Sequence, residues 1–429
     1  MLAYCCRFCF STRSCLSNKG IGHPEASTLT PFVKTHHDYD WITTEPELRQ
    51  YCSDLAQASR IGFDTEFVSE DTFRSQLCLV QVAAAGRLAV IDPLGVGNMT
   101  PFWEVIAGPG HDTVVHAGRE ELLFCRAATG QAPTELFDLQ IAAGLVGYEY
   151  PAGYSSLMNR LLGEKLHKGE TRTDWRRRPL SVQQIEYALD DVRYLEPMRD
   201  KLQARLEKMD RTAWMVDEMA AWQSDVESSM TRERWRRVSG ISGLSARSLA
   251  IVREVWRWRE EEAERRDQPT RRVLRDDLVV ELAKRRSADP KQMRAVRGFE
   301  RGDLVRALPK ISEAVSRALA LPEEELPRAS ARNVSDQFNV LGQFVSSALG
   351  SICRSANLAP SIVGTASDVR ELIAYRLNIS GAALDGPPAL ATGWRAEIVG
   401  RLIDDLLAGK LAIRIGDPLA DEPLTFVPT

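Results

Sequence analysis

Residues 61–67, Ile-Gly-Phe-Asp-Thr-Glu-Phe (IGFDTEF), read as a buried strand that carries two acids. Side chains alternate between the faces of a strand, so Asp64 and Glu66 share one face beside apolar neighbours. Two such carboxylates are costly to bury unless a cation lies between them. Oxygen ligands of this kind suit Mg²⁺ or Mn²⁺. Taken alone, however, a pair like this is more often a strand end whose acids are solvated.

The sequence around this strand predicts a mixed sheet flanked by helices. Further strands are expected at residues 77–83 (LCLVQVA), 88–91 (LAVI), 113–116 (TVVH) and 136–137. Helices are expected at residues 119–129, 139–145, 155–162 and 181–209. A leading hairpin followed by alternating strands and helices favours an α/β domain.

Two more polar clusters follow in the sequence. Tyr187 and Asp191 are four residues apart on a predicted helix and so share a face, where a phenol and a carboxylate can hold one water. Glu120 and Glu121 follow the strand that ends at His116. Acids at a helix start are favoured by the helix dipole without any function. Surface acids and a core tyrosine are the simpler interpretation of each cluster alone.

Composition bounds the class of protein. The chain has 429 residues, of which 44% are hydrophobic and 27% are charged, which is typical of two to four globular domains. It has no apolar run long enough to cross a bilayer, so we expect no membrane partner. Residues 231–320 contain 23 Lys or Arg and 14 Asp or Glu, a net charge of +9, within a chain of net charge −4. This block favours a nucleic-acid grip or an arginine-rich solvated surface about equally.

Four of the eight cysteines lie in the first fifteen residues and the others are scattered singly, as in a reducing compartment. The cluster lacks the paired spacing of a zinc site. Residues 1–37 read as a transit peptide, a disordered tail or a start assigned too far upstream. We expect a cytoplasmic protein, with organellar targeting as the alternative.

Five motifs, taken in order and spacing, resemble the ribonuclease D family of ribonuclease-H-like 3′→5′ exonucleases. They are FDTEF, VVHAGREELLF, ELFDLQIAAGLVG, TRTDWRRRPLS and QIEYALDDVRYL. The resemblance implies an exonuclease domain at 38–218 and an all-α HRDC domain at 240–327. It also implies a second HRDC-like helical domain at 330–412. The segments outside these domains are expected to be an N-terminal tail (1–37) and a C-terminal tail (413–429), the latter extended or disordered.

The same resemblance implies a pair of divalent ions, Mg²⁺ or Mn²⁺, at the catalytic residues. Their ligands would be Asp64, Glu66, Glu121 and Asp191, and Tyr187 would orient the attacking water or help to deprotonate it. At position 121 the family has aspartate, so the glutamate here departs from the pattern by one methylene. Asp138 matches a family acid outside the usual ligand set and is a weaker candidate.

Substrate contacts are expected from apolar, polar and basic residues near these motifs. The candidates for nucleic-acid binding are Phe67, Gln81, His116, Arg172, Trp175, Arg176, Arg177 and Arg178. The implied activity is release of nucleoside 5′-monophosphates from RNA 3′ ends, with tRNA precursors or other structured RNAs as partners. The alternatives are the same chemistry on DNA, or an RNA-binding protein whose catalysis is weakened by Glu121.

Overall fold

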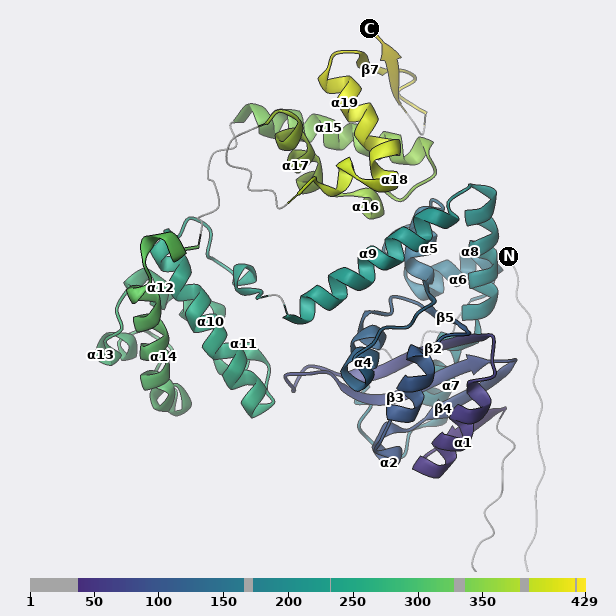
Figure 1. Ribbon diagram of the computed structural model, residues 1–429, viewed down its shortest axis with the longest axis horizontal. Helices are drawn as coiled ribbons and strands as arrows, with labels where there is room; N and C mark the ends of the chain where they lie inside the picture. The colour runs from purple at the N-terminus through teal and green to yellow at the C-terminus, as the bar shows by residue number, and fades with distance from the viewer. Residues whose placement is uncertain (1–37, 166–172, 232, 328–335, 379–385, 421–422) are drawn as a thin grey trace, which may run out of the picture. The chain divides into compact units, whose positions relative to one another are not determined.

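The computed structural model describes residues 38–165, 173–231, 233–327, 336–378, 386–420 and 423–429. The chain opens with a six-stranded sheet in the order β1-β4-β3-β2-β5-β6 (Figure 1). Its strands are β1 (Tyr39–Ile42), β2 (Arg60–Val68), β3 (Gln76–Ala84), β4 (Arg87–Ile91), β5 (Asp112–Val115) and β6 (Leu136–Asp138). β3 pairs antiparallel with β2 and β4, and the other pairs of this sheet are parallel. The predicted mixed sheet is confirmed, with β1 as a strand that the sequence did not indicate.

Helices cover both faces of the sheet, because apolar side chains of its central strands point alternately to the two faces. Phe63 and Val82 pack with α1 (Glu45–Leu55), α3 (Thr100–Ala107) and α4 (Arg119–Thr129) on one face. Leu79 and Val90 pack with Leu189 of α7 (Val182–Arg193) on the other. The short helix α2 (Pro93–Val96) follows β4. Asp64, Glu66 and Gln81 therefore lie on the face covered by α7.

Four further helices complete this part of the chain: α5 (Leu139–Leu145), α6 (Tyr154–Leu162), α8 (Leu195–Lys208) and α9 (Thr212–Thr231). Gly62 of β2 allows α8 to come close, because a Cβ at this position would lie 3.2 Å from a Leu195 methyl carbon. The expected helix over 181–209 is in fact two helices, α7 and α8, which meet at Tyr194.

The basic block forms a helical unit with its own core. It contains a 3₁₀ turn (Trp235–Arg237), α10 (Ala246–Arg266), α11 (Thr270–Val273), α12 (Asp276–Arg285), α13 (Pro290–Arg294), α14 (Gly302–Ala320) and a second 3₁₀ turn (Glu323–Glu325). Helix α14 is a single helix of 19 residues. Pro309 lies inside it, but Leu304, Ile311 and Val315 keep one apolar stripe buried, and this packing outweighs the missing backbone hydrogen bond.

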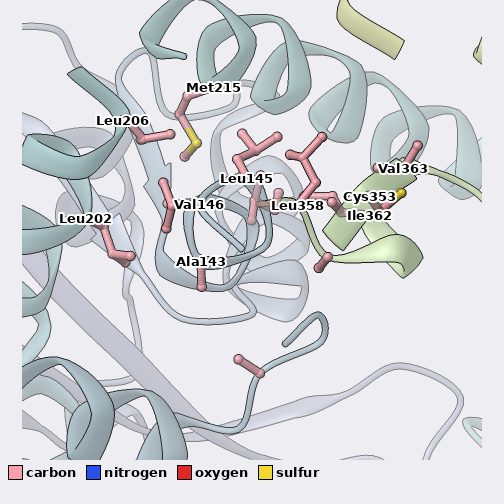
Figure 2. Close-up of a cluster of buried hydrophobic side chains, with 14 of the residues drawn as sticks. Ala143, Leu145, Val146, Leu202, Leu206, Met215, Cys353, Leu358, Ile362 and Val363 are labelled. Atoms are coloured by element: carbon pink, nitrogen blue, oxygen red, sulfur yellow. The ribbon is translucent and has the colours of Figure 1, made fainter. Parts of the chain in front are cut away.

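The C-terminal helices share a core with the first part of the chain. They are α15 (Asp336–Ser355), α16 (Pro360–Val363), α17 (Ala366–Arg376), a 3₁₀ turn (Ala389–Ala391), α18 (Gly393–Arg395), a π-helical turn (Ala396–Gly400) and α19 (Arg401–Leu407). Figure 2 shows Leu145, Leu202 and Met215 in one cluster with Leu358 and Ile362. The C-terminal helices therefore pack directly on α5 and its neighbours.

Two predicted boundaries need correction. A domain end at residue 218 falls inside α9, which continues to Thr231 because Met215 and Met219 are buried in that shared core. Residues 413–429 are not simply a tail, since β7 (Leu411–Ile415) pairs antiparallel with β8 (Leu424–Pro428). The expected tail over 1–37 lies outside the described residues. In the part of the chain that the structure describes, no helix is both long and apolar enough to cross a membrane.

Candidate active site

The acidic pair on β2 is half-buried beside a buried glutamine on the neighbouring strand. Asp64 lies opposite Gln81 in the β2–β3 register, and the Gln81 Nε2 atom donates to the Asp64 Oδ2 atom over 3.0 Å. The Gln81 Oε1 atom is buried and has no hydrogen-bond partner. Thr65 lies between the two acids, so its side chain points to the opposite face of the strand.

Helix α7 brings Tyr187 and Asp191 to the acids of β2. The helix begins with a capping box in which the Ser181 hydroxyl accepts from the Gln184 amide while the Gln184 side chain accepts from the Ser181 amide. One turn separates Tyr187 from Asp191, and each of the two groups shifts the pKa of the other, so they lie close together. The predicted shared face of these two residues is therefore present.

Glu121 reaches the site from the first turn of α4. It is 5% exposed, and its Oε1 atom accepts from the Thr65 hydroxyl. The loop before α4 is tight, because a Cβ at Gly118 would lie 2.4 Å from a Val115 methyl carbon. The neighbouring Glu120 accepts instead from the Ser75 hydroxyl over 2.9 Å.

Burial disfavours the charged forms of all four acids, and neighbouring negative charges add to this effect. Burial first, and then the charges of Glu121, Asp191 and Glu66, raise the pKa of Asp64 well above its ordinary value. Burial together with the charges of Asp191 and Glu121 raises the pKa of Glu66 to about 8. Burial also raises the pKa of Glu121 to about 7, against the hydrogen bond from Thr65. The pKa of Asp191 is likewise raised to about 7, by burial and by the charge of Asp190.

This donor set fits a hard divalent cation. The charges of Glu66, Glu121 and Asp191 all act on Asp64, so four carboxylates from three elements lie near one another, and the unpartnered Gln81 oxygen adds a neutral acceptor. Within the described residues, no group of three or more His, Cys, Asp or Glu side chains is already arranged to hold an ion. Gln81 donates a hydrogen bond to one carboxylate oxygen of Asp64, and Thr65 donates one to a carboxylate oxygen of Glu121. Glu121 keeps its Oε2 atom for an ion while Thr65 binds Oε1, so it is the other carboxylates that rotate before three of them meet at one ion.

Asp138 supports the loop that precedes α4. It is 1% exposed, and its carboxylate accepts from the amides of Ala117 (3.2 Å), Gly118 (2.9 Å) and Gln140 (2.7 Å). The last of these bonds caps the start of α5. All three contacts are structural, so Asp138 acts on the site by fixing the start of α4.

Phe67 and His116 lie on the strand ends near the acids. The Phe67 ring packs edge-on against Phe124, with ring centroids 6.0 Å apart. The His116 Nε2 atom is 2.9 Å from the Ala152 carbonyl oxygen, and burial lowers the pKa of this histidine. Tyr154, which the sequence did not single out, packs edge-on against His116 and donates to the Asp190 carbonyl oxygen.

The predicted basic stretch separates into structural and accessible residues. Trp175 is 5% exposed and packs against Tyr187, so it offers no open ring for stacking a base, which corrects that expectation. Arg178 forms a bidentate pair with the buried Asp92 at 2.6 and 2.7 Å, which assigns it a structural role as well. Arg176 pairs with Asp174, whereas Arg177 is largely exposed. Arg172 lies outside the described residues.

Comparisons with known proteins place the chain in a family. Residues 39–207 match the family model described as 3′–5′ exonuclease, and residues 248–315 match the HRDC domain. The ribonuclease D of Jannaschia sp. (strain CCS1) is 34% identical over 383 residues, covering 87% of this chain and 96% of that protein. The chain belongs to the ribonuclease D family. The ribonuclease D of Acidiphilium cryptum is also 34% identical, covering 87% of this chain and 94% of that protein.

A solved structure of ribonuclease D shows the same fold. The crystal structure of Escherichia coli RNase D, an exoribonuclease involved in structured RNA processing, superposes with a TM-score of 0.75 at 27% identity, covering 87% of this chain and 99% of that chain. The predicted family and fold class are confirmed. As a ribonuclease D, the chain is a 3′–5′ exoribonuclease that binds nucleic acid, and its exonuclease fold implies a divalent metal.

Proposed function

We propose that Asp64, Glu66, Glu121 and Asp191 hold two divalent ions, Mg²⁺ or Mn²⁺, at which the 3′-terminal phosphodiester of RNA is hydrolysed. The observation that carries this proposal is the gathering of four carboxylates, one buried and three half-buried, from β2, α4 and α7, whose pKa values are all raised. When bound, the ions supply charge stabilisation to the attacking and leaving oxygens. A cation also removes the repulsion that burial imposes on these acids.

Tyr187 orients the attacking water in this proposal. Burial and the charges of Asp191 and Glu66 raise the pKa of Tyr187, so the phenol keeps its proton at neutral pH. The protonated hydroxyl can then hydrogen-bond the attacking water. Water adds to phosphorus, the bond from phosphorus to the 3′-oxygen breaks, and that oxygen leaves with a proton. The products are a nucleoside 5′-monophosphate and an RNA shortened by one residue.

The substrates that we propose are 3′ tails of tRNA precursors and other structured RNAs. Support comes from the Escherichia coli relative, which is described as an exoribonuclease involved in structured RNA processing. Arg176 and Arg177 would contact the RNA backbone, beside Phe67 near the end of β2 and His116 just after β5. The domain limits that we propose are 38–231, 240–327 and 330–428, so that the last includes the β7–β8 hairpin, and the first and third share one core.

We also propose that the enzyme acts in the cytoplasm. Cys52, Cys78, Cys125 and Cys353 are unpaired and buried, as is usual for thiols of a reducing compartment. Fractionation of the native cells, with the enzyme detected by antibody, tests this assignment.

The test of function is digestion of a 5′-labelled RNA that ends in a single-stranded 3′ tail. We expect a ladder of products shortened one residue at a time in Mg²⁺ or Mn²⁺, together with free nucleoside 5′-monophosphates. Asp64→Asn should abolish this ladder while its circular dichroism spectrum stays that of the wild type. DNA of the same sequence should be degraded at least tenfold more slowly. Binding of RNA with no shortening in either metal would instead favour an RNA-binding protein weakened by Glu121.

A further inference from the structure

Thr65 separates the two acids of β2 but belongs to the other side of the strand. It is 5% exposed and lies opposite Val80 of β3. Its side chain shares a face with Phe63, where α4 packs on the sheet. The Thr65 hydroxyl donates to the Glu121 Oε1 atom, so β2 holds the carboxylate that α4 presents.

Glu121 needs such a contact more than an aspartate would. Its side chain has one more rotatable bond, and each added rotor increases the entropy cost of fixing the carboxylate. A hydroxyl from a central strand of the sheet fixes one oxygen of that carboxylate. The second oxygen is left for the cluster formed with Asp64 and Glu66, whose charges act on one another.

We propose that Thr65 is a positioning residue that fixes the longer Glu121 side chain as a metal ligand, and so makes glutamate workable at this position. This inference rests on the proposed function, because it takes Glu121 as a ligand. Partners of this kind set the orientation and basicity of a ligand, and their removal commonly weakens metal binding by about 10–100-fold. An aspartate at position 121 ends one methylene earlier and does not span the same distance to Thr65.

The test is a double-mutant cycle read out by Mn²⁺ binding to the full-length protein without RNA. Thr65→Val removes the hydroxyl and keeps the shape of the side chain, and we expect the Mn²⁺ dissociation constant to rise about 10–100-fold in calorimetry. Thr65→Ser keeps the hydroxyl and should stay within about threefold of the wild type. In the Glu121→Asp background, Thr65→Val should change the constant by less than about twofold, because the shorter carboxylate does not reach the hydroxyl in the first place.

Thr113→Val serves as the control for the chemical change. Thr113 is 1% exposed on β5, so the substitution also replaces a buried threonine of the same sheet. Its Mn²⁺ affinity should match that of the wild type. In RNA digestion, Thr65→Val should be slow at low Mn²⁺ and should recover as Mn²⁺ is raised, whereas a purely structural defect does not recover.

Two outcomes overturn the inference. One is a Thr65→Val protein that binds Mn²⁺ as tightly as the wild type. The other is that Thr65→Val weakens Mn²⁺ binding equally in the wild-type protein and in the Glu121→Asp variant. Failure of the wild-type protein to bind Mn²⁺ at all would overturn the proposed function along with the role of Thr65, so the two failures are distinguishable.

Discussion

At the scale of single residues, this chain places four acidic side chains in surroundings that disfavour their charged forms. Asp64, Glu66, Glu121 and Asp191 are each buried enough that their protonated forms are favoured over their ordinary balance. The folded protein therefore stores unfavourable electrostatic energy that a bound cation releases. Stability and metal binding are linked at this one site.

We expect the metal-free protein to lose stability as pH rises from about 5 to about 8. The pKa values of Glu66 (about 8) and of Glu121 (about 7) exceed their ordinary values in the folded state. The folded protein thus binds more protons than the unfolded chain across this range, and the free energy of unfolding falls as pH rises. Urea unfolding at several pH values in a chelator measures the slope.

Mn²⁺ should flatten that slope, because the ion replaces the protons. Glu66→Gln should flatten it too, by removing the carboxylate whose pKa is raised to about 8. A metal-free protein that is equally stable at pH 5.5 and pH 8 would contradict the electrostatic picture of the site.

Glu121→Gln should reduce turnover strongly if the glutamate is a ligand. Removing a charged ligand costs about 3 kcal/mol of transition-state stabilisation, roughly a 100-fold slower reaction. Glu121→Asp should be nearly neutral, or should favour Mg²⁺ over Mn²⁺, because it restores the aspartate of the family. If Glu121 serves only the helix dipole, Glu121→Gln changes stability by about 0.3–1 kcal/mol and leaves turnover unchanged. Single-turnover rates in both metals distinguish these results.

At the scale of secondary structure, α9 and α5 carry the contacts that join the first part of the chain to its C-terminal helices. The Arg211 guanidinium, just before α9, is 7% exposed and donates to the carbonyl oxygens of Leu145, Ala356 and Asn357. Three carbonyl oxygens thereby satisfy a cation that burial would otherwise penalise. One side chain thus connects the end of α5 with the turn after α15.

A second connection runs from Glu218 in the middle of α9 to Arg395. These side chains form a bidentate ion pair at 2.6 and 2.8 Å, and only 14% and 19% of their surfaces are exposed. Beside the pair, the rings of Trp214 and Trp394 are stacked with centroids 5.2 Å apart. A domain boundary at residue 218 would therefore cut through the packing that holds α9 against the C-terminal helices.

Glu218→Gln should destabilise the protein by about 1–3 kcal/mol, because it leaves the half-buried Arg395 without its counter-charge. The matched control is Glu196→Gln. Glu196 pairs with Arg60 but is 54% exposed, so its replacement should cost less than about 1 kcal/mol. Chemical denaturation of both variants at neutral pH measures the two changes in unfolding free energy. Equal costs for the two variants would mean that the Glu218 pair is only a surface contact.

At the scale of the whole molecule, the net positive charge lies in a different part of the chain from the proposed catalytic acids. The acids of the site belong to the sheet and its helices, while the net positive block belongs to the HRDC region. Many arginines of that block pair with acids of the same block, as Arg259 does with Asp276 and Arg301 with Asp303. The charge available to RNA is therefore smaller than the composition suggests.

Exposed arginines of the HRDC region should set the salt dependence of RNA binding. Arg294 and Arg306 are exposed on α13 and α14. Changing both to glutamine should lower the slope of log affinity against log salt by about 0.7–0.9 for each phosphate that is no longer neutralised. The same change at Arg49 and Arg160, which are exposed on α1 and α6, should leave the slope unchanged. Filter binding between 50 and 300 mM salt measures both. An equal slope in all three proteins would mean that this surface only interacts with solvent.

The sequence by itself determined the family and the mixed sheet, and it predicted the acids that we propose as the catalytic site. Alternating apolar residues predict β2 and β3. The motifs that contain Asp64, Glu121 and Asp191 each lie on the strand or helix that carries the acid. Local signals of this kind suffice because strand alternation and helix spacing are properties of neighbouring residues.

Tertiary structure alone decided how those residues are held. Thr65 and Gln81 contact the carboxylates across strand and helix boundaries, and such partners depend on register rather than on local pattern. Burial turned Trp175 from an expected stacking surface into a core residue. Helix α9 continues past residue 218, where the sequence predicts the end of the first domain, and a shared core joins this helix to elements about 150 residues away. Contacts at such separation leave no periodic signal in the chain, so only folding reveals them.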